Sequence, residues 1–386
     1  MRFSLSLPTR QYYRIAVSTF FFIMGFTFAS WANRIPDVKR TLHLNDAQLG
    51  GLLFSLPIGQ LVAMGLSGYL VSKYSSKKIL KFAILVYPLA VITLGLAKES
   101  WHLAAGLFCM GMFGNMCGIS VNTQGVGVER LYRRSIMASF HGVWSLAGFA
   151  GGVFATFMVS LDITPFVHFC IVYAITFSLM IAMRNWILPR DANPPQKQKR
   201  RVLKPSRQIV FLGMIVFGSM ICEGTMFDWS VIYFENIIQP PKELVRLGYI
   251  VFMFMMSAGR FTADRLVTKF GVQKILKVSG IIIASGLLTA VIFPYMVTAT
   301  IGFLLVGLGT SSVVPLCYSL AGRSKDMNPG VAITTVASIG FAGFLIGPPL
   351  IGFISQMSNL RWSFALIAVL GLMTTIVASR VKLQTN

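Results

Sequence analysis

The stretch PRDANPPQKQKRRVLKPSR, at residues 189–207, interrupts a chain that is otherwise dominated by apolar residues. The 386 residues are 55% hydrophobic and 12% charged, whereas soluble globular proteins carry about 25% charged residues. This Pro-rich, basic stretch is the longest polar segment, and it lies midway along the chain. We therefore expect a polytopic membrane protein in which residues 189–207 form a linker between two halves.

The apolar segments on either side of this linker are roughly 18–25 residues long, which is the length that a helix needs to cross a bilayer core. They predict an all-α membrane protein with twelve transmembrane helices, six in residues 1–188 and six in residues 208–386. The predicted spans are 13–35, 46–71, 79–97, 101–125, 135–160, 163–187, 208–234, 246–268, 274–294, 296–320, 329–355 and 360–380.

The net charge of +22 is also typical of nucleic-acid-binding proteins. Here, however, the Lys and Arg residues lie in short segments between apolar runs, where positive charge orients membrane helices. If both termini are cytoplasmic, the outer loops keep only Arg34, Lys39, Arg40, Lys98, Lys242, Arg246 and Arg361. We therefore expect a multi-pass protein of the bacterial inner membrane with both termini in the cytoplasm and no nucleic-acid partner.

The two halves resemble each other in sequence. SSKKILKF at 75–82 matches GVQKILKV at 271–278, and SLAGFAGG at 145–152 parallels SIGFAGFL at 338–345. The offsets of the matching segments stay within about 192–198 residues, as expected of an internal repeat. Two parallel six-helix bundles related by pseudo-symmetry and joined by a linker resemble the major facilitator architecture.

A second stretch, GRFTADRLVTKFG at 259–271, resembles the loop signature that follows the second helix of each half in that superfamily. The resemblance implies a gating role at the cytoplasmic face for Arg260, Asp264 and Arg265. The N-terminal counterpart, GYLVSKYSSKK at 68–78, lacks the acid and the arginine. That half of the gate is therefore expected to be held by other groups.

Further motifs are similar to those of the MosC/YbjJ-like subgroup of the superfamily. They are SWANRIPDVK (30–39), NTQGVGVER (122–130), SFHGVWSLAG (139–148), EGTMFDWS (223–230) and GFLIGPPLIG (343–352). The resemblance covers nearly the whole chain. It implies a transporter that works by alternating access, with helices one, four, seven and ten lining the central path. It suggests a rhizopine-type sugar derivative or related polyols as substrates.

The predicted seventh helix contains MICEGTMFDWS at 220–230, with two carboxylates in an apolar run. Of the twelve acidic residues, only Glu223 falls well within a predicted span, roughly 22 Å along the helix. An ionised carboxylate within the membrane must face protein or water, and burial in general raises a carboxyl pKa. Glu223 is therefore predicted to be the proton-coupling site. The alternative is a protonated Glu that is hydrogen-bonded to a neighbouring helix.

Asp228 lies roughly 30 Å along the same helix, at its outer end, and is turned about 140° from Glu223. Arg34 lies at the equivalent end of helix one. We expect an Arg34–Asp228 ion pair that closes the outer gate. The alternative is that both side chains face loop water.

Polar residues of helices four and five are candidates for binding a solute. Amides pair well with hydroxyl-rich ligands, and an indole can stack on a sugar ring. The predicted substrate-binding residues are Asn115, Asn122, Gln124, His141, Trp144 and, on helix seven, Trp229. The alternative is that these side chains hold helices together. Gly111, Gly114 and Gly118 of helix four and Gly148, Gly151 and Gly152 of helix five are expected to permit close helix approach.

No phosphate loop, metal-ligand cluster or nucleophile triad is evident, so we expect no enzyme activity, cofactor or metal. The five cysteines show no metal spacing. The prediction is a monomeric secondary active transporter of a small polar solute, such as a sugar, polyol or amino-sugar, with a proton as coupling ion and the lipid bilayer as surroundings. Two alternatives stay open, namely efflux of amphipathic compounds by proton antiport and uncoupled facilitation.

Overall fold

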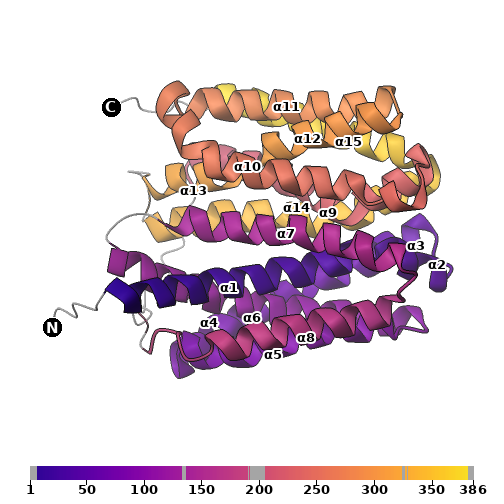
Figure 1. Cartoon of the computed structure of the whole chain (residues 1–386). Coiled ribbons are helices and arrows are strands. Elements are labelled where there is room, and N and C mark those ends of the chain that lie inside the picture. Colours follow the sequence, from indigo (N-terminus) through magenta and orange to yellow (C-terminus); the bar gives the residue numbers. More distant parts are fainter. Residues whose placement is uncertain are drawn as a thin grey trace. The chain divides into compact units, whose positions relative to one another are not determined.

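The computed structural model describes residues 7–132, 136–189, 191, 205–323, 327 and 329–380, apart from the side chains of residues 7, 8, 264 and 329. Throughout these residues the regular structure is helical (Figure 1). Twelve of their helical segments are long and apolar enough to cross a membrane. The twelve-helix membrane fold predicted from the apolar runs is therefore confirmed.

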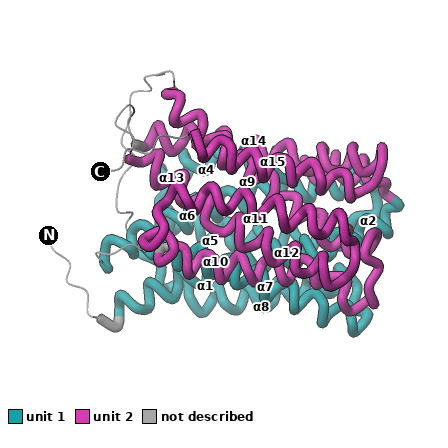
Figure 2. Tube along the Cα trace, turned by 90° about the horizontal axis from the view of Figure 1, so that it is seen from above, with its two compact units in different colours: residues 1–43, 55–198 teal, residues 44–54, 199–386 magenta. Residues whose placement is uncertain are grey.

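The chain divides into two compact units, which Figure 2 distinguishes by colour. Unit 1 comprises residues 1–43 and 55–198, and unit 2 comprises residues 44–54 and 199–386. Unit 1 contains α1 (Leu7–Ala32), α2 (Ile35–Thr41), α4 (Ser55–Tyr74), α5 (Ser76–Gly95), α6 (Ser100–Tyr132), α7 (Met137–Ser160) and α8 (Pro165–Met183).

Unit 2 begins with a short segment of the predicted second span. It contains α3 (Asp46–Leu53), α9 (Arg207–Tyr233), a π-helical turn (Phe234–Ile238), a 3-10 turn (Lys242–Leu244), α10 (Leu247–Phe270), α11 (Val272–Ile292), α12 (Met296–Thr310), α13 (Val313–Gly322), α14 (Pro329–Met357) and α15 (Leu360–Arg380). Of the predicted linker at residues 189–207, residues 190 and 192–204 lie outside the described part of the chain.

The predicted second span is divided into α3 and α4 at Phe54, and α3 belongs to unit 2 because it packs on α14. A Cβ at Gly50 would lie 2.6 Å from the Pro348 carbonyl oxygen, so only glycine permits this approach. Ser355 donates a hydrogen bond to the Asp46 carboxylate on the same face. The predicted boundaries assign residues 44–54 to the N-terminal half, whereas their contacts group them with unit 2.

Glycines set the distance between α4 and α6 in unit 1. A Cβ at Gly59 would collide with the Phe108 carbonyl oxygen, and one at Gly111 would collide with the Leu56 carbonyl oxygen. The two helices therefore touch backbone to backbone at two levels, and the close approach predicted for Gly111 is one of them. Such contacts suit a membrane, where small residues let helices gain van der Waals packing.

The internal repeat is visible in the backbone. Ser75 (φ 78°, ψ 149°) precedes α5, and Gly271 (φ 81°, ψ 152°) precedes α11. These two residues align in the repeated segments at 75–82 and 271–278. Glycine adopts this conformation readily, whereas a serine there is strained. The two turns share this backbone geometry although one contains serine and the other glycine. The geometry is therefore a property of the repeat and not of the residue type.

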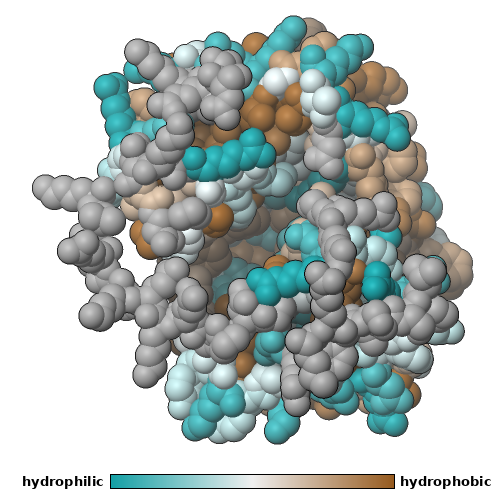
Figure 3. Space-filling model, turned by 90° about the vertical axis from the view of Figure 1, so that its left-hand side faces the viewer, coloured by the Kyte–Doolittle hydropathy of each residue, from teal (hydrophilic) through white to brown (hydrophobic). Residues whose placement is uncertain are grey.

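Arginines near the ends of helices lie over aromatic rings in each unit, and Figure 3 shows a face of the molecule on which hydrophilic residues lie beside hydrophobic ones. In unit 1 the Arg14 guanidinium lies over the Tyr132 ring, 5.5 Å from its centroid. In unit 2 Arg207 lies over the Phe211 ring at 5.1 Å. Cations above aromatic rings are well suited to a membrane–water interface.

Candidate functional site

Glu223 lies on α9 within unit 2, and only 5% of its surface is exposed. It is about 24 Å from the start of a helix that is roughly 40 Å long, which places it in the central part of the span. The Ser219 hydroxyl, one turn earlier, donates a hydrogen bond to Oε1 over 3.5 Å. The structure therefore holds a carboxylate at a depth where an ionised group needs specific partners.

The main partner of this carboxylate is Arg260 of α10, whose Nη2 lies 3.8 Å from Glu223 Oε2. Both side chains are largely shielded, with 16% and 7% exposure respectively. Tyr318 of α13 is close enough to interact electrostatically with Glu223. The sequence resemblance predicts a gating role for Arg260, which stays a prediction, and the structure places its guanidinium beside the buried acid.

The predicted tenth span is also interrupted in this region. It divides into α12 and α13 at Ser311 and Ser312, and both side chains are buried. A Cβ on Gly259 would collide with the Ser311 hydroxyl, so α10 touches this break one residue before Arg260. Discontinuous transmembrane helices often form the ligand sites of transporters. A pair of serines within an apolar span was the signal for this break.

Asp228 is half-buried on α9, five residues beyond Glu223. Arg34, its predicted partner, is 2% exposed and has contacts inside unit 1. The Arg34 Nε donates to His168 Nδ1 at 3.0 Å, and Nη2 donates to the Ile163 carbonyl oxygen at 2.8 Å. Nη1 lies 3.4 Å from the Asp37 carboxylate. Arg34 therefore fastens the start of α8 to the end of α1, and its pairing with Asp228 stays a prediction.

Sequence analysis missed His168, because a single His in an apolar helix carries no pattern. The side chain is 0% exposed, and its Nδ1 accepts the hydrogen bond from Arg34. The accepting nitrogen carries no proton, so the ring is neutral with its proton on Nε2. Thr164 caps the N-terminus of α8 and Pro165 occupies its first turn, which fixes where His168 points.

Among the predicted binding residues, Asn115 has the most open hydrogen-bonding capacity. Its Oδ1 is buried and has no hydrogen-bond partner among the described residues. The Asn122 side chain donates through Nδ2 to the Gly118 carbonyl oxygen of its own helix at 2.7 Å. Both amides are half-buried on α6, seven residues apart and hence on one face.

Gln124 performs a structural task in unit 1. Its Nε2 donates to the Ser76 hydroxyl at 2.7 Å, and its Oε1 accepts from the Leu188 backbone nitrogen at 2.9 Å. The Ser76 hydroxyl in turn donates to Asp191. These bonds tie the end of α6 to the start of α5 and to the segment after α8. Because both ends of the amide are occupied, these bonds favour the helix-joining alternative for Gln124, and its solute-binding role stays a prediction.

His141 and Trp144 of α7 face α1. The His141 ring is exposed and meets Phe21 edge-on, with ring centroids 5.1 Å apart. Trp144 is half-buried, and its ring lies 6.1 Å from that of Phe28. The stacking of a solute on the Trp144 indole stays a prediction.

Trp229 of α9 is 0% exposed, and its indole Nε1 has no hydrogen-bond acceptor among the described residues. The ring is therefore covered in this structure, and its solute-binding role stays a prediction. Of the predicted gate residues on α10, Arg265 is exposed, and the side chain of Asp264 lies outside the described part of the structure. No cluster of three or more His, Cys, Asp or Glu able to hold a metal occurs among the described residues.

Comparison with known proteins places this geometry in a wider context. The sequence profile of the Major Facilitator Superfamily matches residues 15–328 and, in a second match, residues 241–385. An uncharacterised MFS-type transporter of Yersinia pestis is 32% identical over 93% of this chain and 92% of its own length. The membrane protein MosC of Rhizobium meliloti is 28% identical over 94% of this chain and 89% of its own length.

Solved structures share the fold at low sequence identity. A D-xylose-proton symporter superposes with a TM-score of 0.75 at 13% identity, covering 94% of this chain and 96% of that protein. The nucleoside transporter NupG has a TM-score of 0.72 at 12% identity, covering 96% and 100%. A bacterial homologue of the human lysosomal transporter Spinster has a TM-score of 0.73 at 14% identity, covering 98% of each chain.

Proposed function

Because the chain belongs to the Major Facilitator Superfamily, we propose that it is a proton-coupled symporter of a small polar solute, with Glu223 as the proton-binding residue. The observation that carries this proposal is the buried Glu223 carboxylate, which lies 3.8 Å from Arg260 Nη2 in the central part of α9. Ionisable groups inside membrane spans are rare and commonly mark proton pathways.

The Glu223–Arg260 pair provides two states that differ by one proton. The ionised carboxylate is attracted to the guanidinium, whereas the protonated carboxyl loses most of that attraction. The distance of 3.8 Å is near the outer limit for an ion pair, so small helix movements can loosen it. A proton on Glu223 thus changes how strongly α9 holds α10, which is the kind of link that coupled transport needs.

The chemistry of unit 1 supports a hydroxyl-bearing solute. The buried Asn115 Oδ1 can accept a hydrogen bond from a hydroxyl, and the half-buried Trp144 ring can stack on a sugar face. Symporters of D-xylose and transporters of nucleosides share the fold. We propose a sugar, polyol or amino-sugar as solute, with Asn115, Asn122 and Trp144 among its ligands.

The surroundings of the transporter follow from its charge distribution. We propose that it is a monomer in a bacterial inner membrane and that both termini lie in the cytoplasm, because basic side chains gather at the end of the helices where the chain starts. Arg265, with Asp264, is proposed to act in the gate at this end. The Arg34–Asp228 pair is proposed as a contact formed when Arg34 releases His168.

The experiment that tests the proposed function is thermal unfolding of the purified protein against a panel of sugars, polyols, amino-sugars, nucleosides and amphipathic drugs at two pH values. A ligand that binds the folded state raises the melting temperature by mass action. We expect hits among the hydroxyl-rich solutes, with a pH dependence that disappears in Glu223→Gln. Hits restricted to amphipathic drugs contradict the proposal and favour efflux by proton antiport.

A further inference from the structure

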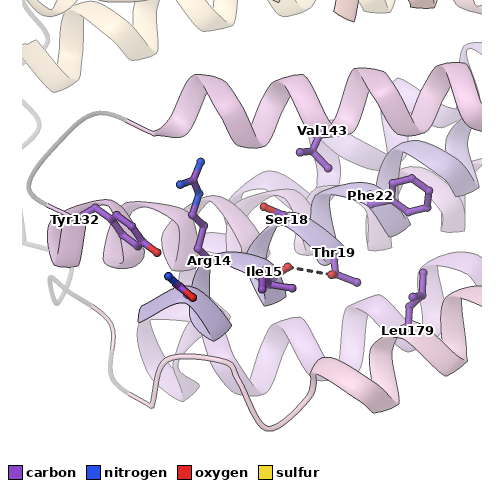
Figure 4. Close-up of a pocket in the computed structure, with 9 residues that line it drawn as sticks. Arg14, Ile15, Ser18, Thr19, Phe22, Tyr132, Val143 and Leu179 are labelled. Atoms are coloured by element: carbon purple, nitrogen blue, oxygen red, sulfur yellow. Dashed lines mark hydrogen bonds between the residues drawn. The ribbon is translucent and has the colours of Figure 1, made fainter. Parts of the chain in front are cut away.

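Unit 1 carries an open groove of about 700 Å³ along the first half of α1. Side chains of α1, α6, α7 and α8 line it, namely Gln11, Arg14, Ile15, Ser18, Thr19, Phe22, Tyr132, Val143 and Leu179. Figure 4 shows Arg14 and Tyr132 at the end near the start of α1, and Phe22 and Leu179 at the opposite end. The groove is thus polar and cationic at one end and apolar at the other.

Aromatic residues show where this groove lies relative to the membrane surface. Trp186, just after α8, stacks on Tyr12 with ring centroids 4.3 Å apart and meets Tyr13 edge-on at 6.4 Å. Trp and Tyr gather at the level of lipid headgroups. Arg14 is the next lining residue after this aromatic cluster. The cationic end of the groove therefore lies at headgroup level, and its apolar end points into the bilayer.

The length of the groove matches one leaflet. Arg14 and Phe22 are eight residues apart, which corresponds to about 12 Å along α1. Half of a bilayer core is about 15 Å thick. Ile15 is 49% exposed along this path, so α1 presents apolar surface to whatever fills the groove. An extended acyl chain is the natural occupant of such a surface.

The positive charge at the headgroup end of the groove favours an anionic group in the ligand. The Arg14 guanidinium is held over the Tyr132 ring at 5.5 Å, which orients its donors, and the Gln11 amide lies beside it in the lining. None of the nine lining residues is acidic. The nearby Glu129 is directed to the start of α7, where its Oε2 accepts hydrogen bonds from the backbone nitrogens of Ile136 and Met137 at 2.7 and 2.9 Å.

We propose that this groove is a binding site for an anionic phospholipid of the inner leaflet. The phosphate is bound by Arg14 and Gln11, and one acyl chain lies along Ile15, Phe22 and Leu179. Basic pockets between transmembrane helices on the cytoplasmic side bind anionic headgroups in the same way. The site involves unit 1 alone and is separate from Glu223.

The test is the melting temperature of the delipidated protein after addition of dioleoyl phosphatidylglycerol or dioleoyl phosphatidylcholine. We expect phosphatidylglycerol to raise it more, by mass action. Arg14→Gln is expected to reduce the response to the phosphatidylcholine level, and Arg14→Lys to retain most of it. Thr19→Trp, which fills the groove, is expected to reduce the response while leaving the charge intact.

The matched control is Arg207→Gln in unit 2, which removes another arginine that lies over an aromatic ring, at the start of α9. Its response to phosphatidylglycerol is expected to equal that of the wild type. Equal loss in both Arg→Gln variants would show a general surface-charge effect and overturn the proposal. So would equal responses to the two lipids, or an equal shift with soluble glycerol 3-phosphate, which would identify a site for a free anion.

Discussion

At the scale of single residues, two clusters of buried charge join helices within the two units. The pair of Glu223 and Arg260 joins α9 to α10 in unit 2, and the cluster of Arg34 and His168 joins α1 to α8 in unit 1. Each cluster places charge in an apolar environment, at a desolvation cost that only specific partners offset. The Glu223–Arg260 distance of 3.8 Å is near the outer limit for an ion pair. Arg34, in contrast, is held by three separate contacts.

The sequence was sufficient to identify Glu223 as a candidate proton-coupling residue, because it is the one acid well inside a predicted span. Its partnership with Arg260 could not be predicted, since 37 positions separate the two and the side-chain directions depend on how α9 crosses α10. For Gln124, the sequence could not distinguish between two possible roles. An amide that binds a solute and one that joins helices look alike in a sequence, and only the bonds to Ser76 and Leu188 distinguish them.

Replacement of His168 tests the buried arginine cluster. His168→Ala removes the acceptor of the Arg34 Nε and is expected to lower the free energy of unfolding by about 1.5–3 kcal/mol, the range for hydrogen bonds to charged groups. Denaturant unfolding of the purified protein measures it. His168→Gln, which keeps an acceptor, is expected to recover part of the loss. His102→Ala is the control, and a loss of equal size there would contradict the assignment.

At the scale of helices and turns, two glycines of α4 distinguish the effect of a close helix contact from the effect of the glycine backbone itself. Gly59→Ala places a methyl group against the Phe108 carbonyl oxygen and is expected to destabilise the protein by about 1–3 kcal/mol. Gly65→Ala on the same helix meets nothing within 4 Å and is expected to be neutral or stabilising. Melting temperatures of the two variants give the comparison. Equal effects would show that α4 and α6 do not pack as described.

Opposite substitutions in the turns before α5 and α11 are expected to have opposite effects on stability. Ser75→Gly is expected to relieve backbone strain and stabilise the protein by about 1 kcal/mol, whereas Gly271→Ala is expected to destabilise it by about 1–3 kcal/mol. A Cβ at Gly271 meets no atom within 4 Å, so the effect comes from the backbone alone. Unfolding measurements on both variants test this, and a destabilising Ser75→Gly would refute the proposed equivalence.

The helices themselves were predictable and their interruptions were not. A window of apolar residues reports length and composition, so the spans from 208 and from 360 were placed within a few residues of α9 and α15. The break at Phe54 leaves the apolar pattern intact, whereas the break at Ser311 coincides with a pair of serines that the average over a long apolar window hides. The transfer of α3 to unit 2 depends on Gly50 and Gly352, whose neighbours lie about 300 positions away.

At the scale of the whole molecule, two similar units carry different chemistry. Unit 1 holds the half-buried amides of Asn115 and Asn122, and unit 2 holds the Glu223–Arg260 pair. The repeated segments before α5 and α11 keep the same backbone geometry although their residues differ. We infer that duplication supplied the scaffold and that later substitutions gave one unit the proposed solute ligands and the other the proposed proton site.

The central claim is that Glu223 couples a proton to solute movement, and proton flux in proteoliposomes tests it most directly. A pH-sensitive dye inside the vesicles records proton entry when the solute identified by thermal unfolding is added outside. The account predicts proton entry together with solute entry for the wild type. For Glu223→Gln it predicts no proton flux and no accumulation, while exchange of internal for external solute continues. Solute-driven proton entry at the wild-type rate in Glu223→Gln would contradict it.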